Sequence, residues 1–194
     1  MATEIRERGK RRDRYVSWLV IGVLVVALVL GWVVKLAAEG RVVSFRDEGT
    51  GVSGHYPAGW LKRSVLPPYI LQVEDSAALP VKSTLTLQRR PLQGDLRRMN
   101  AVLAAERALN LGECNAYRVV SSEEPASFYG RTGMHVAFAY VDPTVAGRPV
   151  VMMGEDYIFL EGDWVYIATL TAAEGNMEQA RMVLQRFVAA LQVP

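Results

Sequence analysis

A run of 19 residues without a charge, from Val16 to Val34, constrains this chain more than any other feature, and 16 of those residues are apolar. At 1.5 Å per residue, a helix of this length spans roughly 28 Å, close to the ~30 Å hydrocarbon core of a bilayer. The run is apolar on every face, which argues against a core helix of a soluble domain. We therefore expect one transmembrane helix over residues 16–38, with the lipid bilayer as its partner.

The residues that flank this run fit the two interfaces of a membrane. Tyr15 and Trp18 lie at one end and Trp32 lies near the other, where aromatic rings prefer the headgroup region. Lys35 can extend its ammonium group outward from the far end. A cleaved signal peptide is the alternative, but the apolar run is longer than the 7 to 15 residues typical of such peptides, which favours an uncleaved signal-anchor.

The charges beside the run predict its orientation. Six basic residues stand among the first fourteen, whereas the first fifteen residues beyond Val34 hold only Lys35, Arg41 and Arg46. By the positive-inside rule, residues 1–15 form a cytoplasmic basic tail that contacts lipid headgroups. Residues 39–194 then form a domain outside the cytoplasm, held at the cell membrane by a single pass.

The domain beyond the run is mildly acidic. From Leu36 onward the chain has 15 basic and 17 acidic residues, a net charge of −2, so we expect no nucleic-acid partner. Its single cysteine, Cys114, excludes an intrachain disulfide. The domain must therefore be stable through its hydrophobic core, and about 155 residues are enough to build one.

Short apolar or alternating runs bounded by Gly, Pro and Asp predict strands in the domain. The strands are expected at residues 41–46, 50–56, 69–73, 83–88, 117–123, 132–141, 150–160 and 164–171. Apolar residues at helical spacing predict helices over residues 95–109 and 176–191. Strands that follow one another in runs indicate an α+β fold with a central antiparallel sheet and helices packed on it.

The segment from Gly51 to Trp60, Gly-Val-Ser-Gly-His-Tyr-Pro-Ala-Gly-Trp, ends the first expected hairpin. Pro57 should stop the strand and Trp60 has a large apolar surface to bury. This motif and the element order resemble the PsbP-like α/β/α sandwich family over roughly residues 42–193. The family includes an extrinsic protein of photosystem II, a Ran-binding import factor and bacterial membrane-anchored proteins. The resemblance implies a membrane-anchored bacterial member, and it implies no catalytic residues.

Few residues suggest a metal site. His55 and His135 both fall in expected strands, with no spacing that would fix them on one face. The acidic pair Glu155 and Asp156 could bind calcium or act as an acid and a base, but we expect it to be a solvated part of the last hairpin. These four residues are weak metal candidates, and we expect no cofactor.

Two arginine doublets and one tryptophan are candidates for interaction with a partner. Arg89-Arg90 and Arg97-Arg98 stand around the start of the first helix of the domain, where they could bind an acidic partner or lipid headgroups. Solvated surface charges are the alternative. Trp60 could stack on a ligand, although packing is the commoner role of such a side chain.

The sequence lacks the motifs of a nucleophilic enzyme or a phosphate-binding loop. We therefore expect a non-enzymatic binding protein, an accessory or assembly subunit of a membrane protein complex such as a photosynthetic or respiratory one. The alternative is a small-ligand or metal receptor with a pocket that includes Trp60, His55 or His135. A hydrolase with an unrecognised site is a third hypothesis.

Overall fold

The computed structural model describes residues 18–32, 41–111, 116–143 and 148–194. It divides into two units, Met1–Arg41 and Val42–Pro194, which we describe separately. In the first unit, residues 18–32 form a helix whose side chains are all exposed. Cys114 lies outside the described residues.

The described part of the first unit is helical from Trp18 to Trp32. Tyr15 and Lys35 lie outside the described residues. Among the helices of the described residues, none combines the length and the apolarity that a membrane crossing requires. Both ends of the expected span, residues 16–17 and 33–38, lie outside the described residues.

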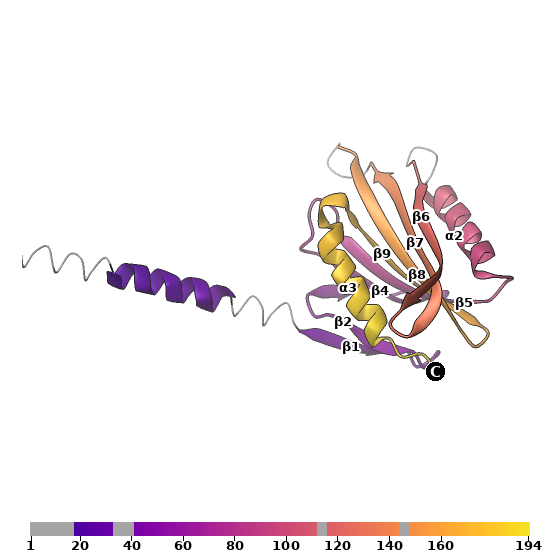
Figure 1. Ribbon diagram of the computed structural model, residues 1–194, viewed down its shortest axis with the longest axis horizontal. Helices are drawn as coiled ribbons and strands as arrows, with labels where there is room; N and C mark the ends of the chain where they lie inside the picture. Colours follow the sequence, from indigo (N-terminus) through magenta and orange to yellow (C-terminus); the bar gives the residue numbers. More distant parts are fainter. Residues whose placement is uncertain (1–17, 33–40, 112–115, 144–147) are drawn as a thin grey trace, which may run out of the picture. The chain divides into compact units, whose positions relative to one another are not determined.

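The second unit is built on a seven-stranded antiparallel sheet, in the order β3-β4-β5-β9-β8-β7-β6 (Figure 1). Its strands are β3 (Trp60–Lys62), β4 (Tyr69–Asp75), β5 (Ser83–Pro91), β6 (Arg118–Phe128), β7 (Arg131–Asp142), β8 (Val150–Glu161) and β9 (Trp164–Ala173). Two more strands, β1 (Val42–Arg46) and β2 (Ser53–Pro57), form a separate hairpin. This hairpin corrects our expectation of a single sheet, and β3 is a strand that the sequence analysis missed.

Helices α2 (Leu96–Leu111) and α3 (Met177–Ala190) cover opposite faces of the sheet (Figure 1). A short 3-10 helix, Glu174–Asn176, leads from β9 into α3. The Asp95 carboxylate accepts a 2.8 Å hydrogen bond from the backbone N–H of Arg98, which caps the start of α2. The α/β/α arrangement with a central antiparallel sheet is confirmed for this unit.

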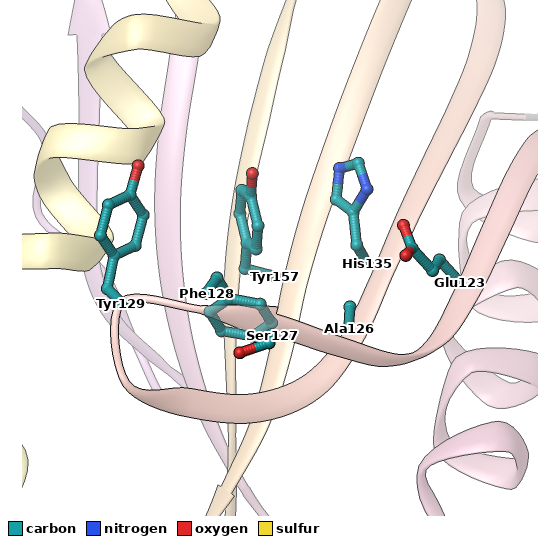
Figure 2. A pocket seen from close by; sticks show the side chains of 7 residues that line it. All are labelled: Glu123, Ala126, Ser127, Phe128, Tyr129, His135 and Tyr157. Atoms are coloured by element: carbon teal, nitrogen blue, oxygen red, sulfur yellow. The ribbon is translucent and has the colours of Figure 1, made fainter.

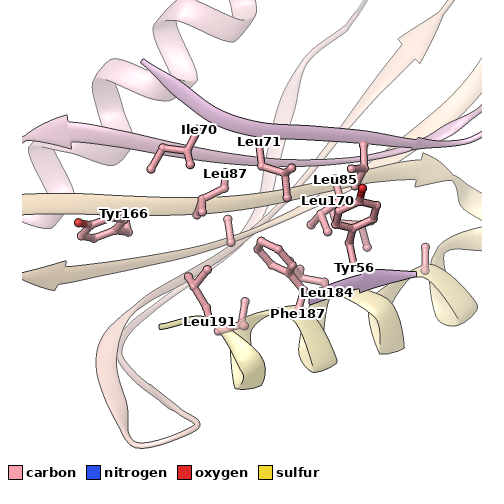
Figure 3. Close-up of a cluster of buried hydrophobic side chains, with 14 of the residues drawn as sticks. Tyr56, Ile70, Leu71, Leu85, Leu87, Tyr166, Leu170, Leu184, Phe187 and Leu191 are labelled. Carbon is pink, nitrogen blue, oxygen red and sulfur yellow. The ribbon is translucent and has the colours of Figure 1, made fainter. Parts of the chain in front are cut away.

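The larger core lies between the sheet, α3 and the β1–β2 hairpin (Figure 3). Leu71, Leu85 and Leu170 on the sheet meet Leu184 and Phe187 on α3, and all five are at most 1% exposed. The ring of Phe45 in β1 stacks on Phe187 with centroids 5.9 Å apart, which attaches the hairpin to α3. The apolar residues that recur at helical spacing in the expected helix over residues 176–191 are all buried, namely Met177, Ala180, Leu184, Phe187, Val188 and Leu191.

A smaller core lies under α2. Met99 and Leu103 of the helix pack against Met134, Val136 and Ile158, among others. Val102, the apolar residue that precedes Leu103, is 43% exposed. The two faces of the sheet therefore differ, with an extensive apolar contact to α3 and a narrower one to α2.

Candidate functional site

A cavity of about 320 Å³ opens on the α3 side of strands β6, β7 and β8. The sheet register places Glu123 opposite His135, and His135 opposite Tyr157, so these residues form one row across three strands. Residues directly opposite one another share a face of the sheet, and Tyr157 packs against the α3-side core. The row therefore forms the floor of the cavity.

The β6–β7 turn forms one end of the cavity. Phe128 pairs with Arg131, so Tyr129 and Gly130 are a two-residue loop, with φ of +50° and +79°. A turn with two positive φ values favours Asn-Gly, because a tyrosine adopts this backbone conformation only at a cost. Figure 2 shows the Tyr129 ring beside Tyr157 and pointing in the same direction, with His135 and Glu123 beyond them.

Behind this row, Glu155 is held in place by α3. Its side chain is only 4% exposed, and Oε1 accepts a 2.7 Å hydrogen bond from Nε of Arg181. The other oxygen, Oε2, lies 3.6 Å from Nε2 of His135, and neither atom has a hydrogen-bond partner among the described residues. The imidazole also stacks on the Tyr157 ring with centroids 4.9 Å apart.

The charge state of Glu155 follows from these contacts. Burial favours its neutral form, but His135 and Arg181 more than offset this effect and hold the pKa of Glu155 below its usual value. Burial raises the pKa of Tyr157, with a further contribution from the Glu155 charge. The site therefore contains an ionised, buried carboxylate beside a neutral phenol.

The neighbouring acidic residue faces the opposite side of the sheet. Asp156 is fully buried, and its carboxylate accepts hydrogen bonds of 2.5 and 2.7 Å from Arg107 of α2 and one of 2.7 Å from Thr169. Burial disfavours the charged guanidinium, but the Asp156 carboxylate outweighs this effect and raises the pKa of Arg107. Both carboxylates lie in the middle of β8, so the expected solvated hairpin end is wrong.

The four weak metal candidates are thus divided between three places. His135 and Glu155 come together in the cavity, Asp156 lies across the sheet, and His55 is exposed on the separate β1–β2 hairpin. Strand alternation separates Glu155 from Asp156, because consecutive side chains point to opposite faces. No group of three His, Cys, Asp or Glu residues within the described ranges is arranged to hold a metal ion.

The four arginines proposed for docking do not form one free patch. Arg90 makes a bidentate pair with Glu106, at 2.8 Å for both contacts, and Arg97 pairs with Glu124 at 2.6 Å. The Arg89 guanidinium lies 3.8 Å from the centroid of the Trp164 ring. Arg98 is exposed at the start of α2.

Trp60 begins β3 and pairs with Asp75 of β4. Its ring is partly buried and packs against the α3-side core. It does not line the cavity beside His135. The structure therefore gives Trp60 the packing role that we considered the commoner one.

Sequence reasoning missed Glu123, Tyr129, Tyr157 and Arg181 as site residues. The expected strand over residues 117–123 ended at residue 123, whereas β6 continues to Phe128 and so forms the turn that carries Tyr129. The alternation in β8 could have placed Glu155 and Tyr157 on one face. No sequence pattern links them to Arg181.

The cavity lacks the arrangement that a serine hydrolase needs. Ser127 lines it, but Figure 2 shows its hydroxyl directed away from His135. Within the described residues there is no hydrogen bond between a serine and this histidine. The groups that face the cavity are aromatic rings, an imidazole and a carboxylate, which suit recognition of a ligand.

The comparisons with known proteins place the fold. No protein-family model and no curated protein sequence matches the chain. The solution structure of cyanobacterial PsbP (CyanoP) from Synechocystis sp. PCC 6803 is similar, with 12% identity over 79% of this chain and 92% of that chain and a TM-score of 0.56. The Saccharomyces cerevisiae Ran-binding protein Mog1p is also similar, with 11% identity over 79% of this chain and 95% of that chain and a TM-score of 0.54. The unit Val42–Pro194 therefore has the α+β fold of cyanobacterial PsbP and yeast Mog1p, as the sequence resemblance predicted.

Proposed function

We propose that this chain is a membrane-anchored binding protein and that its PsbP-like domain is an accessory or assembly subunit of a membrane protein complex. The observation that carries the proposal is the cavity beside α3. It is open to solvent and built from Glu123, Tyr129, His135 and Tyr157, which can recognise a partner without a bound cofactor. Mog1p, a neighbour in fold, is a Ran-binding protein by name, so a domain of this shape binds another protein in at least one case.

The membrane part of the proposal rests on the sequence. The charge-free run from Val16 to Val34 and the six preceding basic residues favour an anchor with a cytoplasmic N-terminus. The domain would then work on the outer side of the membrane as a bacterial anchored member of this fold. Few residues separate Lys35 from the first residue of β1, Val42, so the domain would stay close to the bilayer.

Purification of the full chain in mild detergent, with chemical crosslinking in cells beforehand, tests the partner. We expect one membrane protein to be recovered in a constant ratio to this chain. A chain that purifies alone after crosslinking contradicts the proposal. Protease added after the outer barrier is opened tests the topology: it should digest residues 39–194 and leave the first fifteen protected.

A small-ligand receptor is the second candidate function. The observation that favours it is the size of the cavity, about 320 Å³, which is at the small end of the usual range of ligand pockets. Thermal-shift screening separates the two candidates, because a ligand that binds the folded state raises the melting temperature of the purified chain. A stabilising small molecule favours the receptor.

A further inference from the structure

We propose that the cavity beside α3 binds an organic cation, an ammonium or guanidinium group, presented either by a free small molecule or by a basic side chain of the partner. The inference rests on the proposed binding function and adds the chemical class of the ligand. Its site consists of Glu123, Tyr129, His135 and Tyr157, which line the cavity (Figure 2), and of Glu155, whose carboxylate lies 3.6 Å from His135.

The positions of the two His135 nitrogens favour a ligand that donates hydrogen bonds. Its Nε2 faces Oε2 of Glu155 at 3.6 Å, and the ionised carboxylate can only accept. In a neutral imidazole the carboxylate places the proton on Nε2, which leaves Nδ1 as an acceptor. Figure 2 shows this second nitrogen on the side of Glu123. An imidazole acceptor and a carboxylate then border the same space, and both require a donor from the ligand.

The charged side chains near the cavity favour a cationic ligand. Glu123 lines the cavity, and Glu155 lies next to His135 with its carboxylate bound by the guanidinium of Arg181, which also binds Glu178. The guanidinium of Arg131 is turned elsewhere, to the carbonyls of Val188 and Leu191. The balance is negative, so an anionic ligand such as a phosphate would be repelled and a cation attracted.

The two tyrosine rings at the cavity also favour a cationic ligand. Tyr129 and Tyr157 stand side by side at one end of the cavity, and Tyr129 is 50% exposed (Figure 2). The faces of tyrosine rings attract cations, and ammonium or guanidinium groups are commonly bound between such rings and a carboxylate. The turn holds Tyr129 at a φ of +50°, a backbone conformation that asparagine adopts more readily than tyrosine. The tyrosine ring therefore stands at this position despite a cost in backbone energy.

The size of the cavity limits the ligand. A volume of about 320 Å³ accommodates one amino-acid side chain or a small amine. A bare metal ion is a poorer fit, because no three His, Cys, Asp or Glu side chains among the described residues are grouped so that they could hold one. An organic cation can use the rings and the two acceptors together.

Two variants with matched controls test the site in the full chain in detergent. Glu123→Gln removes the exposed carboxylate, and its control is Glu48→Gln, an exposed carboxylate in the β1–β2 turn. Tyr129→Asn removes the ring and gives the turn its preferred residue, and its control is Tyr69→Asn in β4, a tyrosine of similar exposure at 40%. Because Asn-Gly favours this turn, Tyr129→Asn should melt at the same temperature as the wild type or higher. A lower melting temperature would assign Tyr129 a structural role and count against the proposal.

Agmatine, which carries an ammonium and a guanidinium group, is the probe. We expect saturable binding, followed by NMR shifts of the tyrosine and histidine resonances, and an affinity about fivefold to tenfold lower in each site variant than in its control. Sulfate should not compete. Equal binding by Glu123→Gln and Glu48→Gln, binding of zinc ions in place of agmatine, or no saturable binding would overturn the site.

Crosslinking of the same variants separates the two sources of the cation. If the partner supplies it, capture is lost in Glu123→Gln and in Tyr129→Asn and is reduced by agmatine. If the ligand is a free amine, agmatine binds while no partner is captured, which supports the site and contradicts the accessory-subunit function. If all variants capture the partner equally and agmatine does not bind, the cation site is refuted and the accessory-subunit function stands.

Discussion

Glu155 and Asp156 are consecutive residues of β8, and their buried carboxylates point to opposite faces of the sheet, where each is bound by an arginine of the helix on that face. Arg181 of α3 binds Glu155 at 2.7 Å, and Arg107 of α2 binds Asp156 through two hydrogen bonds. The two ion pairs fix both helices to the same point of the central sheet. They also differ, because Asp156 is enclosed by protein whereas Glu155 is adjacent to an open cavity.

Loss of the Arg107–Asp156 pair should destabilise the fold more than loss of the Arg181–Glu155 pair. Asp156→Asn leaves the Arg107 guanidinium without its counter-ion under α2. We therefore expect the free energy of unfolding to fall by about 3 to 5 kcal/mol. Urea unfolding followed by circular dichroism measures this change. The double variant Arg107→Met/Asp156→Asn should recover part of the loss, because no buried charge remains.

The control for this prediction is Glu124→Gln. It removes the pair with Arg97, whose side chain is 76% exposed, and should leave the unfolding midpoint unchanged within error. A midpoint for Asp156→Asn equal to that of the control would contradict the prediction. The prediction would also be contradicted if the double variant were destabilised by the sum of the effects of Arg107→Met and Asp156→Asn.

The stabilising contribution of Glu155 should depend on pH. Its pKa is lower in the folded state than in the unfolded chain, so folding favours the ionised form. The contribution is complete above the unfolded-state pKa of about 4.3 and is lost as the pH falls through the lower folded-state value. The difference in unfolding free energy between wild type and Glu155→Gln should therefore be constant near neutral pH and shrink on acidification. A difference that grows as the pH falls would contradict the sign of this shift.

The sequence predicted the fold well because the fold depends on local patterns. Most strand boundaries and the buried stripe of α3 follow from apolar periodicity and turn residues, which neighbouring positions encode. The prediction failed at Glu155-Asp156, where two adjacent acidic residues resembled a solvated hairpin end. They are tolerated inside β8 because their arginine partners come from 26 and 49 residues away, and such distant pairing has no local signature.

The site was less predictable than the fold for a related reason. His135 was a candidate in the sequence, but its neighbours Glu123 and Tyr157 become neighbours only through the register of β6, β7 and β8. A shift of one residue in either register would turn them to the other face. Tyr129 was hidden because a tyrosine does not predict a turn with positive φ.

Arg131 should stabilise the end of α3. Its guanidinium donates hydrogen bonds of 3.0 and 2.5 Å to the carbonyl oxygens of Val188 and Leu191, at the end of the helix where the helix dipole favours a cation. Arg131→Met should lower the free energy of unfolding by about 1 to 2 kcal/mol. Hydrogen exchange should show the largest loss of protection in the last turn of α3. If Arg118→Met, an exposed arginine of β6, has the same effect, the capping role is refuted.

Gly133 should be required for the pairing of β7 with β8. A Cβ at this position would lie 2.0 Å from the backbone oxygen of Ile158, and a backbone atom cannot move aside as a flexible side chain can. Gly133→Ala must therefore displace β8 itself, and we expect a larger destabilisation than the about 1 to 3 kcal/mol typical of overpacking. Gly59→Ala is the control, since no atom lies within 4 Å of its Cβ position. The row of Glu123, His135 and Tyr157 on the floor of the cavity crosses the same two strands, so Gly133→Ala should also shift the NMR resonances of Tyr157. Equal unfolding midpoints for the two alanine variants would contradict the register on which the cavity depends.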